Sequence, residues 1–135
     1  MAQAPTRHPF LDDLAEDVVL TSSVLRRSVT GRDRVTRIVK TGGGLYRRQT
    51  PTFLGHVEDR GLFEYDFELE DVVEASGLVS FRRDGKGEIT HLHIAFSPLG
   101  AVLSIAAALR EQLAAEFGSE LFLCCLLYTS DAADE

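Results

Sequence analysis

The sequence predicts a single small α+β domain in which helices pack against a curved, mostly antiparallel sheet. The chain has 135 residues, which is enough for one domain with its own hydrophobic core. Hydrophobic residues make up 44% and charged residues 26% of it, the usual balance of a soluble globular protein. Four β-rich segments separated by turn residues follow one another between residues 50 and 97, and segments with helical spacing flank them.

The charge and the apolar segments limit the partners and the location. The formal net charge is −7, which opposes binding to a phosphate backbone, so we expect no nucleic-acid partner. The first residues lack the charged start and apolar run of a secretion signal. The most apolar stretch, residues 99–109, has about half the length that crosses a bilayer. We therefore expect a cytoplasmic protein without a membrane partner.

The last eleven residues, 125–135, resemble a translation of the adapter used in preparing sequencing libraries. We therefore expect residues 1–124 to form the domain and residues 125–135 to be a non-native tail. No disulfide is expected at Cys124 and Cys125, because neighbouring cysteines rarely satisfy disulfide geometry. The alternative is an authentic apolar strand over residues 121–128.

The first third of the chain predicts a short helix at residues 9–15, a strand at 17–25 and an amphipathic helix at 33–41. In the second helix, Val35, Ile38 and Val39 recur at intervals of three and four. A run of three glycines follows and ends its regular part near Thr41, because glycine weakens a helix.

The rest of the chain predicts strands at 50–58, 62–70, 75–83 and 88–97, with a buried helix at 99–117 that Ser97 caps. The glycine-containing loop at 83–88 predicts a hairpin that pairs Phe81 with Thr90 and Val79 with Leu92. This register places an apolar set on one face of the hairpin, namely Val79, Phe81, Leu92, Ile94 and Phe96. The opposite face then carries Leu78, Ser80, Arg82, Ile89, His91 and His93.

Three phrases of the sequence, at residues 14–22, 29–35 and 94–99, resemble the SnoaL-like (polyketide-cyclase-like) group of the nuclear-transport-factor-two-like superfamily. The resemblance implies a cone-shaped, cystatin-like domain, whose bent sheet wraps a helix and encloses an apolar cavity. The chain departs from that pattern in its short first helix and in the apolar helix after the last strand.

The resemblance also implies a function. It is the binding of a hydrophobic small molecule, with isomerisation, cyclisation or hydration that needs no cofactor, in a protein that forms homodimers. The alternative is a non-catalytic ligand-binding or dimerisation module.

Aromatic residues on the predicted inner face are candidates for the ligand site. We expect Phe53, Phe63, Tyr65 and Phe67 to contact the ligand. Tyr46, at the broken end of the amphipathic helix, is a candidate catalytic residue, because a phenol hydroxyl can polarise a ligand carbonyl. The alternative is that the tyrosines belong to the core, with their hydroxyls at its rim.

His91 and His93 are the other candidate catalytic residues. Two positions apart on a strand, they point to the same side, a spacing that suits zinc or iron. A third ligand would come from Glu64, Asp66 or Glu68, yet such histidines more often lie in water or at a dimer interface, so we expect no resident metal. If the hairpin register is off by one residue, the pair faces the cavity and supplies its base.

An acidic row alternates with the aromatic residues of the same strand. It consists of Glu64, Asp66, Glu68 and Glu70. We expect it on the outer face, paired across strands with Arg82 or Arg83 or with another subunit.

Overall fold

The structure is a computed structural model that describes residues 10–124. The expected non-native tail, 125–135, lies outside the described residues. The elements in chain order are a 3-10 turn (Leu11–Asp13), β1 (Leu14–Ser22), β2 (Val29–Thr30), α1 (Arg32–Gly43), β3 (Arg48–Val57), β4 (Arg60–Glu68), β5 (Ala75–Arg83), β6 (Ile89–Ser97), α2 (Leu99–Phe117) and a second 3-10 turn (Ser119–Leu121). The expected α+β class is confirmed.

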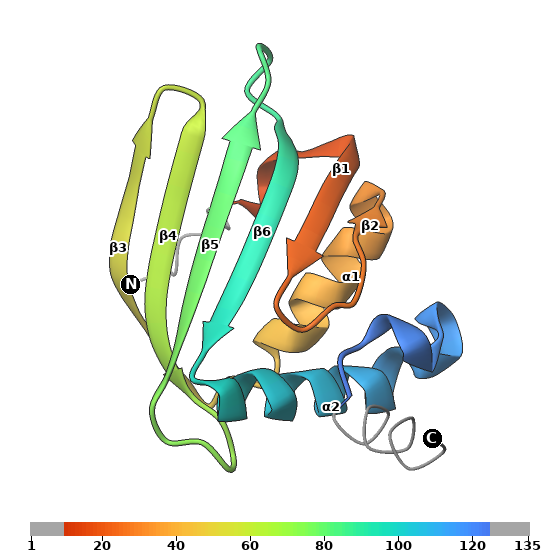
Figure 1. Cartoon of the computed structure of the whole chain (residues 1–135). Coiled ribbons are helices and arrows are strands. Elements are labelled where there is room, and N and C mark those ends of the chain that lie inside the picture. The colour runs from red at the N-terminus through yellow and green to blue at the C-terminus, as the bar shows by residue number, and fades with distance from the viewer. Residues whose placement is uncertain (1–9, 125–135) are drawn as a thin grey trace, which may run out of the picture.

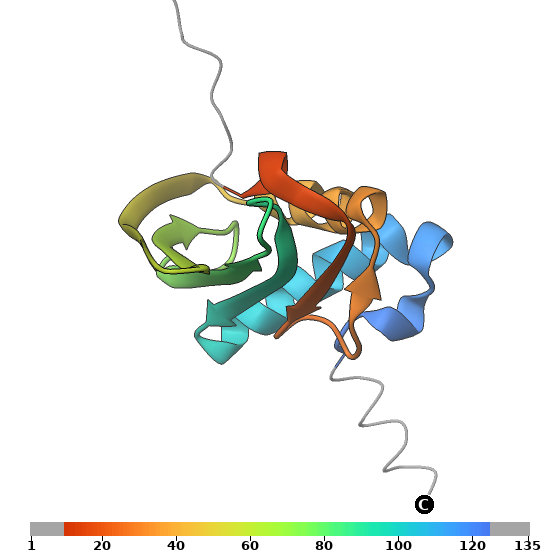
Figure 2. The same ribbon diagram turned by 90° about the horizontal axis from the view of Figure 1, so that it is seen from above.

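The sheet has six strands in the order β2-β1-β6-β5-β4-β3. All neighbouring strands are antiparallel except β1 and β6, which are parallel. The sheet curls strongly, and both helices lie on the same side of it (Figure 1 and Figure 2). One face of the sheet is therefore covered by helices, and we call it the inner face. The opposite face is the outer face.

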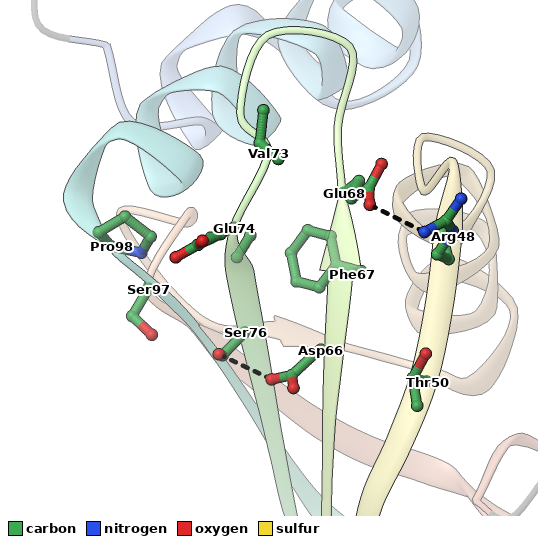
Figure 3. Close-up of a pocket in the computed structure, with 11 residues that line it drawn as sticks. Arg48, Thr50, Asp66, Phe67, Glu68, Val73, Glu74, Ser76, Ser97 and Pro98 are labelled. Carbon is green, nitrogen blue, oxygen red and sulfur yellow. Dashed lines mark hydrogen bonds and ion pairs between the residues drawn. The ribbon is translucent and has the colours of Figure 1, made fainter.

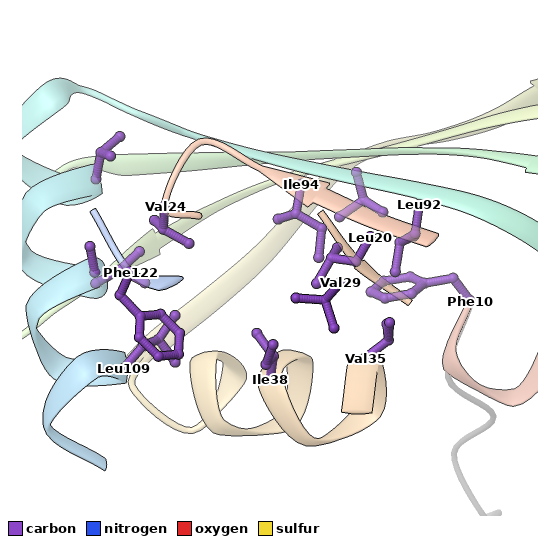
Figure 4. Packing of buried hydrophobic residues seen from close by; sticks show 14 of the residues in the cluster. Phe10, Leu20, Val24, Val29, Val35, Ile38, Leu92, Ile94, Leu109 and Phe122 are labelled. Carbon is purple, nitrogen blue, oxygen red and sulfur yellow. The ribbon is translucent and has the colours of Figure 1, made fainter. Parts of the chain in front are cut away.

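The hydrophobic core fills the space between the inner face and the two helices (Figure 4). Helix α2 is apolar around most of its surface and buries seven residues, from Ala101 to Phe117. The core extends past α2, because Phe122 is fully buried and forms an isolated β-bridge with Leu25. Leu123 continues this pairing by donating its backbone N–H to the carbonyl of Val24. The segment after α2 is thus part of the folded domain.

The predicted helix at 9–15 is wrong within the described residues. Only a three-residue 3-10 turn forms there, and β1 begins at Leu14 rather than at Asp17. Leu14 and Ala15 are both buried in the strand. A single turn is too short to stabilise itself as a helix, so tertiary pairing with β6 decides the conformation.

The two long helices are where the sequence predicts them, with changes at their ends. Helix α1 continues to Gly43, two residues beyond the predicted end, and its buried Gly42 faces Leu109 of α2. Ser97 is the last residue of β6 and makes no capping hydrogen bond to α2, so the predicted cap is wrong. Neither helix in the described part of the chain has both the length and the apolarity needed to cross a membrane.

The predicted hairpin between β5 and β6 forms, with its register shifted by two residues. Phe81 pairs with Leu92 and Val79 with Ile94, and the regular pairing is interrupted between Arg82 and Arg83. A shift of two keeps every side chain on its predicted face, whereas a shift of one reverses them. The interruption turns Ile89 to the inner face, where it is fully buried, which corrects its predicted position.

Two glycines let aromatic rings lie flat on the inner face. A Cβ atom at Gly77 would overlap the ring of Tyr65, and one at Gly61 would overlap the ring of Phe81. Gly77 pairs directly with Tyr65, and Gly61 with Phe81, across β4 and β5. The glycines thus set the positions of both rings.

Candidate functional site

A cavity of about 620 Å³ lies between the inner face of the sheet and the helices. This volume is typical of small-molecule sites, which usually measure about 300–1,000 Å³. Figure 4 shows several of its lining side chains between the sheet and α1. The lining residues are Phe10, Leu20, Ser22, Val24, Ile38, Val39, Gly42, Gly43, Tyr46, Gln49, Pro51, Leu54, Phe63, Tyr65, Ile94, Phe96, Ile105 and Leu109.

No charged residue and no histidine lines this cavity within residues 10–124. Its polar side chains are those of Ser22, Tyr46, Gln49 and Tyr65, and the rest of the wall is apolar. A charged ligand would lose its hydration here without gaining a counter-charge, at a cost of several kcal/mol or more. The cavity therefore suits a neutral ligand.

The two tyrosines reach the cavity from different elements. Tyr46 follows α1 in a loose turn, in which its backbone N–H donates to the carbonyl of Gly43. Tyr65 lies on the inner face of β4 between Phe63 and Phe67, over Gly77. Its ring centroid is 5.2 Å from that of Phe63 and 5.6 Å from that of Phe67. Tyr65 is thus held among aromatic rings.

The hydroxyls of Tyr46 and Tyr65 are 2.6 Å apart and form a hydrogen bond in which either can be the donor. The pair has two hydroxyl protons, and this bond uses one of them. Neither hydroxyl makes another hydrogen bond within the described residues. One proton of the pair therefore remains available to a ligand oxygen.

Both tyrosines resist ionisation. Burial raises the pKa of Tyr46 well above its ordinary value, and the nearby Tyr65 hydroxyl raises it further. Burial also raises the pKa of Tyr65, while the hydrogen bond from Tyr46 lowers it in part. The pair is therefore neutral at physiological pH, where it acts as a hydrogen-bond donor rather than as a base.

These raised pKa values predict a loss of stability in alkali. The neutral phenols favour the folded state, so their contribution is fully present below the unfolded pKa of about 10 and declines above it. The free energy of unfolding in urea should fall between about pH 9 and about pH 11. This fall should be larger for the natural chain than for the double variant Tyr46→Phe/Tyr65→Phe. An equal decrease in unfolding free energy for the two proteins would contradict burial of the phenols.

The structure brings together most of the predicted aromatic site. Tyr46, Phe63 and Tyr65 line the cavity. Phe67 is buried, 4.3 Å from the Tyr46 ring between centroids, but is not part of the wall. Its ring packs against the rings of Tyr46 and Tyr65 outside the cavity wall.

Phe53 does not line the cavity, which corrects its predicted position. It is 51% exposed on β3, and its ring lies over Gly55. The register of β3 shifts between Pro51 and Phe53, which leaves Thr52 unpaired and turns Leu54 toward the cavity instead. A proline within a strand is typical of such a bulge, so Pro51 is the signal for this reversal.

His91 and His93 do not line the cavity either. Both are exposed on the outer face, where Arg82 and Ser80 pair with them from β5. The register shift of two residues leaves them on the face opposite the cavity. The outer-face position predicted for both histidines is confirmed, and the alternative register that would place a base in the cavity does not form.

Sequence reasoning missed the part of the cavity that tertiary packing creates. Phe10, Ile105 and Leu109 come from the N-terminal turn and from α2, far from the aromatic strand in sequence. Gln49 lies on β3 two residues before Pro51 and contributes an amide. No local pattern marks these residues as neighbours.

A second hollow, of about 510 Å³, lies at the end of the sheet where β4 ends and β5 begins (Figure 3). Four of its polar side chains form two pairs. Arg48 forms an ion pair with Glu68 at 3.4 Å, and the Ser76 hydroxyl donates to Asp66 at 3.1 Å. Glu64, Asp66 and Glu68 are on the outer face as predicted, whereas Glu70 lies in the loop after β4. The arginine that pairs with this row is Arg48 rather than Arg82 or Arg83.

The sheet and helices form a cone-shaped α+β domain with a mostly apolar cavity. Solved structures with the same fold are similar to this chain. A protein of Silicibacter pomeroyi with a cystatin-like fold is similar, with a TM-score of 0.72, 18% identity, and coverage of 78% of this chain and 74% of that one. A steroid delta-isomerase of Pseudomonas aeruginosa has a TM-score of 0.71 and 16% identity, over 79% of each chain.

A putative SnoaL-like polyketide cyclase of Jannaschia shares the fold at a TM-score of 0.57 and 9% identity, over 71% of this chain and 75% of that one. No family model and no curated protein matches the sequence. The chain thus has the cystatin-like fold of SnoaL-like and steroid-isomerase proteins. The fold expected from the sequence resemblance is confirmed.

Proposed function

We propose that the domain binds a neutral, hydrophobic small molecule that carries one hydrogen-bond-accepting oxygen, such as a ketone. The observation that carries the proposal is the Tyr46–Tyr65 hydroxyl pair, which has one proton to donate inside an uncharged, mostly apolar cavity. The apolar wall would supply most of the affinity, and the pair would fix the orientation of the ligand.

The hydroxyl pair suits a carbonyl better than a water molecule. A buried donor gains most from an acceptor that fills the cavity and excludes water around it, because the lower dielectric strengthens the hydrogen bond. The first hydroxyl, by donating to the second, makes the second a better donor to the ligand. Aromatic rings around Tyr65 fix this geometry before the ligand arrives.

Binding without proton transfer is favoured over catalysis. Moving a proton on a hydrophobic substrate needs a general base within hydrogen-bond reach. The described lining has no carboxylate and no imidazole, and Ser22 and Gln49 are not bases at neutral pH.

A cofactor-independent isomerase or cyclase is the second candidate. The phenol pair is the kind of donor that stabilises a developing oxyanion, and one solved neighbour carries the name steroid delta-isomerase. This candidate predicts turnover of an unsaturated ketone that the double variant Tyr46→Phe/Tyr65→Phe loses. Binding without turnover supports the first candidate.

The double variant Tyr46→Phe/Tyr65→Phe tests the role of the pair in binding, because in a single variant the remaining hydroxyl still has a proton for the ligand. Losing one neutral hydrogen bond is expected to cost about 0.5–1.5 kcal/mol, which weakens the binding of a polycyclic ketone about 2- to 12-fold. Isothermal titration calorimetry with the ketone, the matching hydrocarbon and the matching carboxylate measures this.

The hydrocarbon is the control in this experiment, since its affinity should not change in the double variant. The carboxylate should bind least to the natural chain, because no cation lines the cavity. Tightest binding of the carboxylate, or the same loss for ketone and hydrocarbon, would exclude the proposed ligand class.

A further inference from the structure

We propose that the outer face of the sheet carries a separate oxyanion-binding site, formed by Arg60, Arg82, His91 and His93, that takes a phosphate-type group. These residues line a hollow of about 140 Å³ on the face opposite the cavity. The hollow is smaller than the sites of drug-sized ligands, which usually exceed about 300 Å³, and suits a single small group. The inference is independent of the proposed function.

Three basic side chains lie in one row across the middle of the sheet. Arg60 on β4 pairs directly with Arg82 on β5, which in turn pairs with His91 on β6. Neighbouring strands are about 4.8 Å apart, so the three Cα atoms span about 10 Å. Long arginine side chains from such positions can reach the same oxyanion.

This row is not neutralised by the chain itself. Like charges directly opposite each other on a sheet destabilise it. Neither Arg60 nor Arg82 makes a side-chain hydrogen bond or ion pair within the described residues, although Arg37, Arg48 and Arg83 each have an acidic partner. None of the residues that line the hollow is acidic. An anion would relieve the repulsion and accept hydrogen bonds from both guanidinium groups.

The two imidazoles are held in place by threonine hydroxyls. Nδ1 of His93 is 2.7 Å from Oγ1 of Thr21, and Nδ1 of His91 is 3.0 Å from Oγ1 of Thr90. When the hydroxyl donates to Nδ1, the proton of the neutral ring is on Nε2, where it can be donated to an anion. The hydroxyl of Ser80, which also lines the hollow, adds another donor.

The same arrangement argues against the metal site that the two histidines suggest in sequence. No group of three metal-ligating side chains occurs within residues 10–124. Glu64 pairs with Leu78, which pairs with Ala95. Its Cα is therefore two strands across and two residues along from that of His93, about 12 Å away, which is too far to complete a site. Two arginines beside the histidines would also repel a cation.

Titration of inorganic phosphate into the full chain tests the proposal, with binding followed by NMR chemical shifts at constant ionic strength set with chloride. The natural chain should bind phosphate, and Arg82→Gln should weaken binding at least about tenfold, as expected for loss of a charge-assisted bidentate contact. Arg47→Gln is the matched control. It removes the same charge from an exposed position outside the hollow and should change binding less than about twofold.

Phosphate shifts no larger than those with chloride, or equal losses in Arg82→Gln and Arg47→Gln, would overturn the proposal. Sedimentation of the same variants tests the alternative that the arginines form a dimer interface. If phosphate fails to bind and Arg82→Gln converts a dimer to monomers, the basic row holds a second copy of the chain, and the oxyanion site is excluded. Circular dichroism confirms that each variant is folded.

Discussion

Replacing Phe122 with alanine is expected to destabilise the domain by about 3–5 kcal/mol. Phe122 is fully buried and packs against the core beyond the end of α2. Its loss would leave a large void, and small domains have only about 5–15 kcal/mol of total stability. Urea unfolding measures the effect as a lower midpoint with little change in slope.

Phe53→Ala is the matched control, because it removes the same side chain from a position that is 51% exposed. Its expected cost is below about 1 kcal/mol. Similar midpoints for the two variants would mean that the segment after α2 does not pack as the structure shows.

Replacing Gly77 with alanine is expected to affect stability and ligand binding together. The new methyl group would overlap the Tyr65 ring, so the ring must move. Overpacking of this kind costs about 1–3 kcal/mol. Displacing Tyr65 also breaks its 2.6 Å hydrogen bond to Tyr46, so ketone affinity should fall about tenfold. Urea unfolding and calorimetry on the same preparation measure both effects.

Gly100→Ala is the control for this substitution, because the space around Gly100 is open and its expected effect is within about 0.5 kcal/mol. A double-mutant cycle isolates the clash: Gly77→Ala should cost less in a Tyr65→Leu background, where no ring occupies the space. An unchanged cost in that background would show that the clash with Tyr65 is not the cause.

The elements whose residues form long periodic patterns were predictable from the sequence. The helices at α1 and α2 and the four strands of the meander are within a few residues of their predicted positions. Alternation alone placed Phe63, Tyr65 and Phe67 on the inner face, since side chains alternate between faces along a strand. The N-terminal turn and the first residues of β1 were not predictable, because one turn of helix has no stability of its own and Leu14 pairs with Ile89 of the distant β6.

The candidate site was predictable in part for the same reason. Tyr46, Phe63 and Tyr65 were identified from local pattern and line the cavity. Phe53 was misplaced because a bulge of one residue reverses the faces of the strand beyond it. The histidines were placed on the correct face, because a register shift of two residues leaves the alternation of side chains unchanged.

By itself, the sequence determined the fold class, the succession of elements and the aromatic strand that forms one wall of the cavity, because alternation and helical spacing are local properties of the chain. Tertiary structure alone decided which hydroxyls meet, where Tyr46 and Tyr65 form their pair, and which charges gather on the outer face. These contacts join residues that are distant in sequence. Their register is set by bulges and by packing between elements, which no local pattern records.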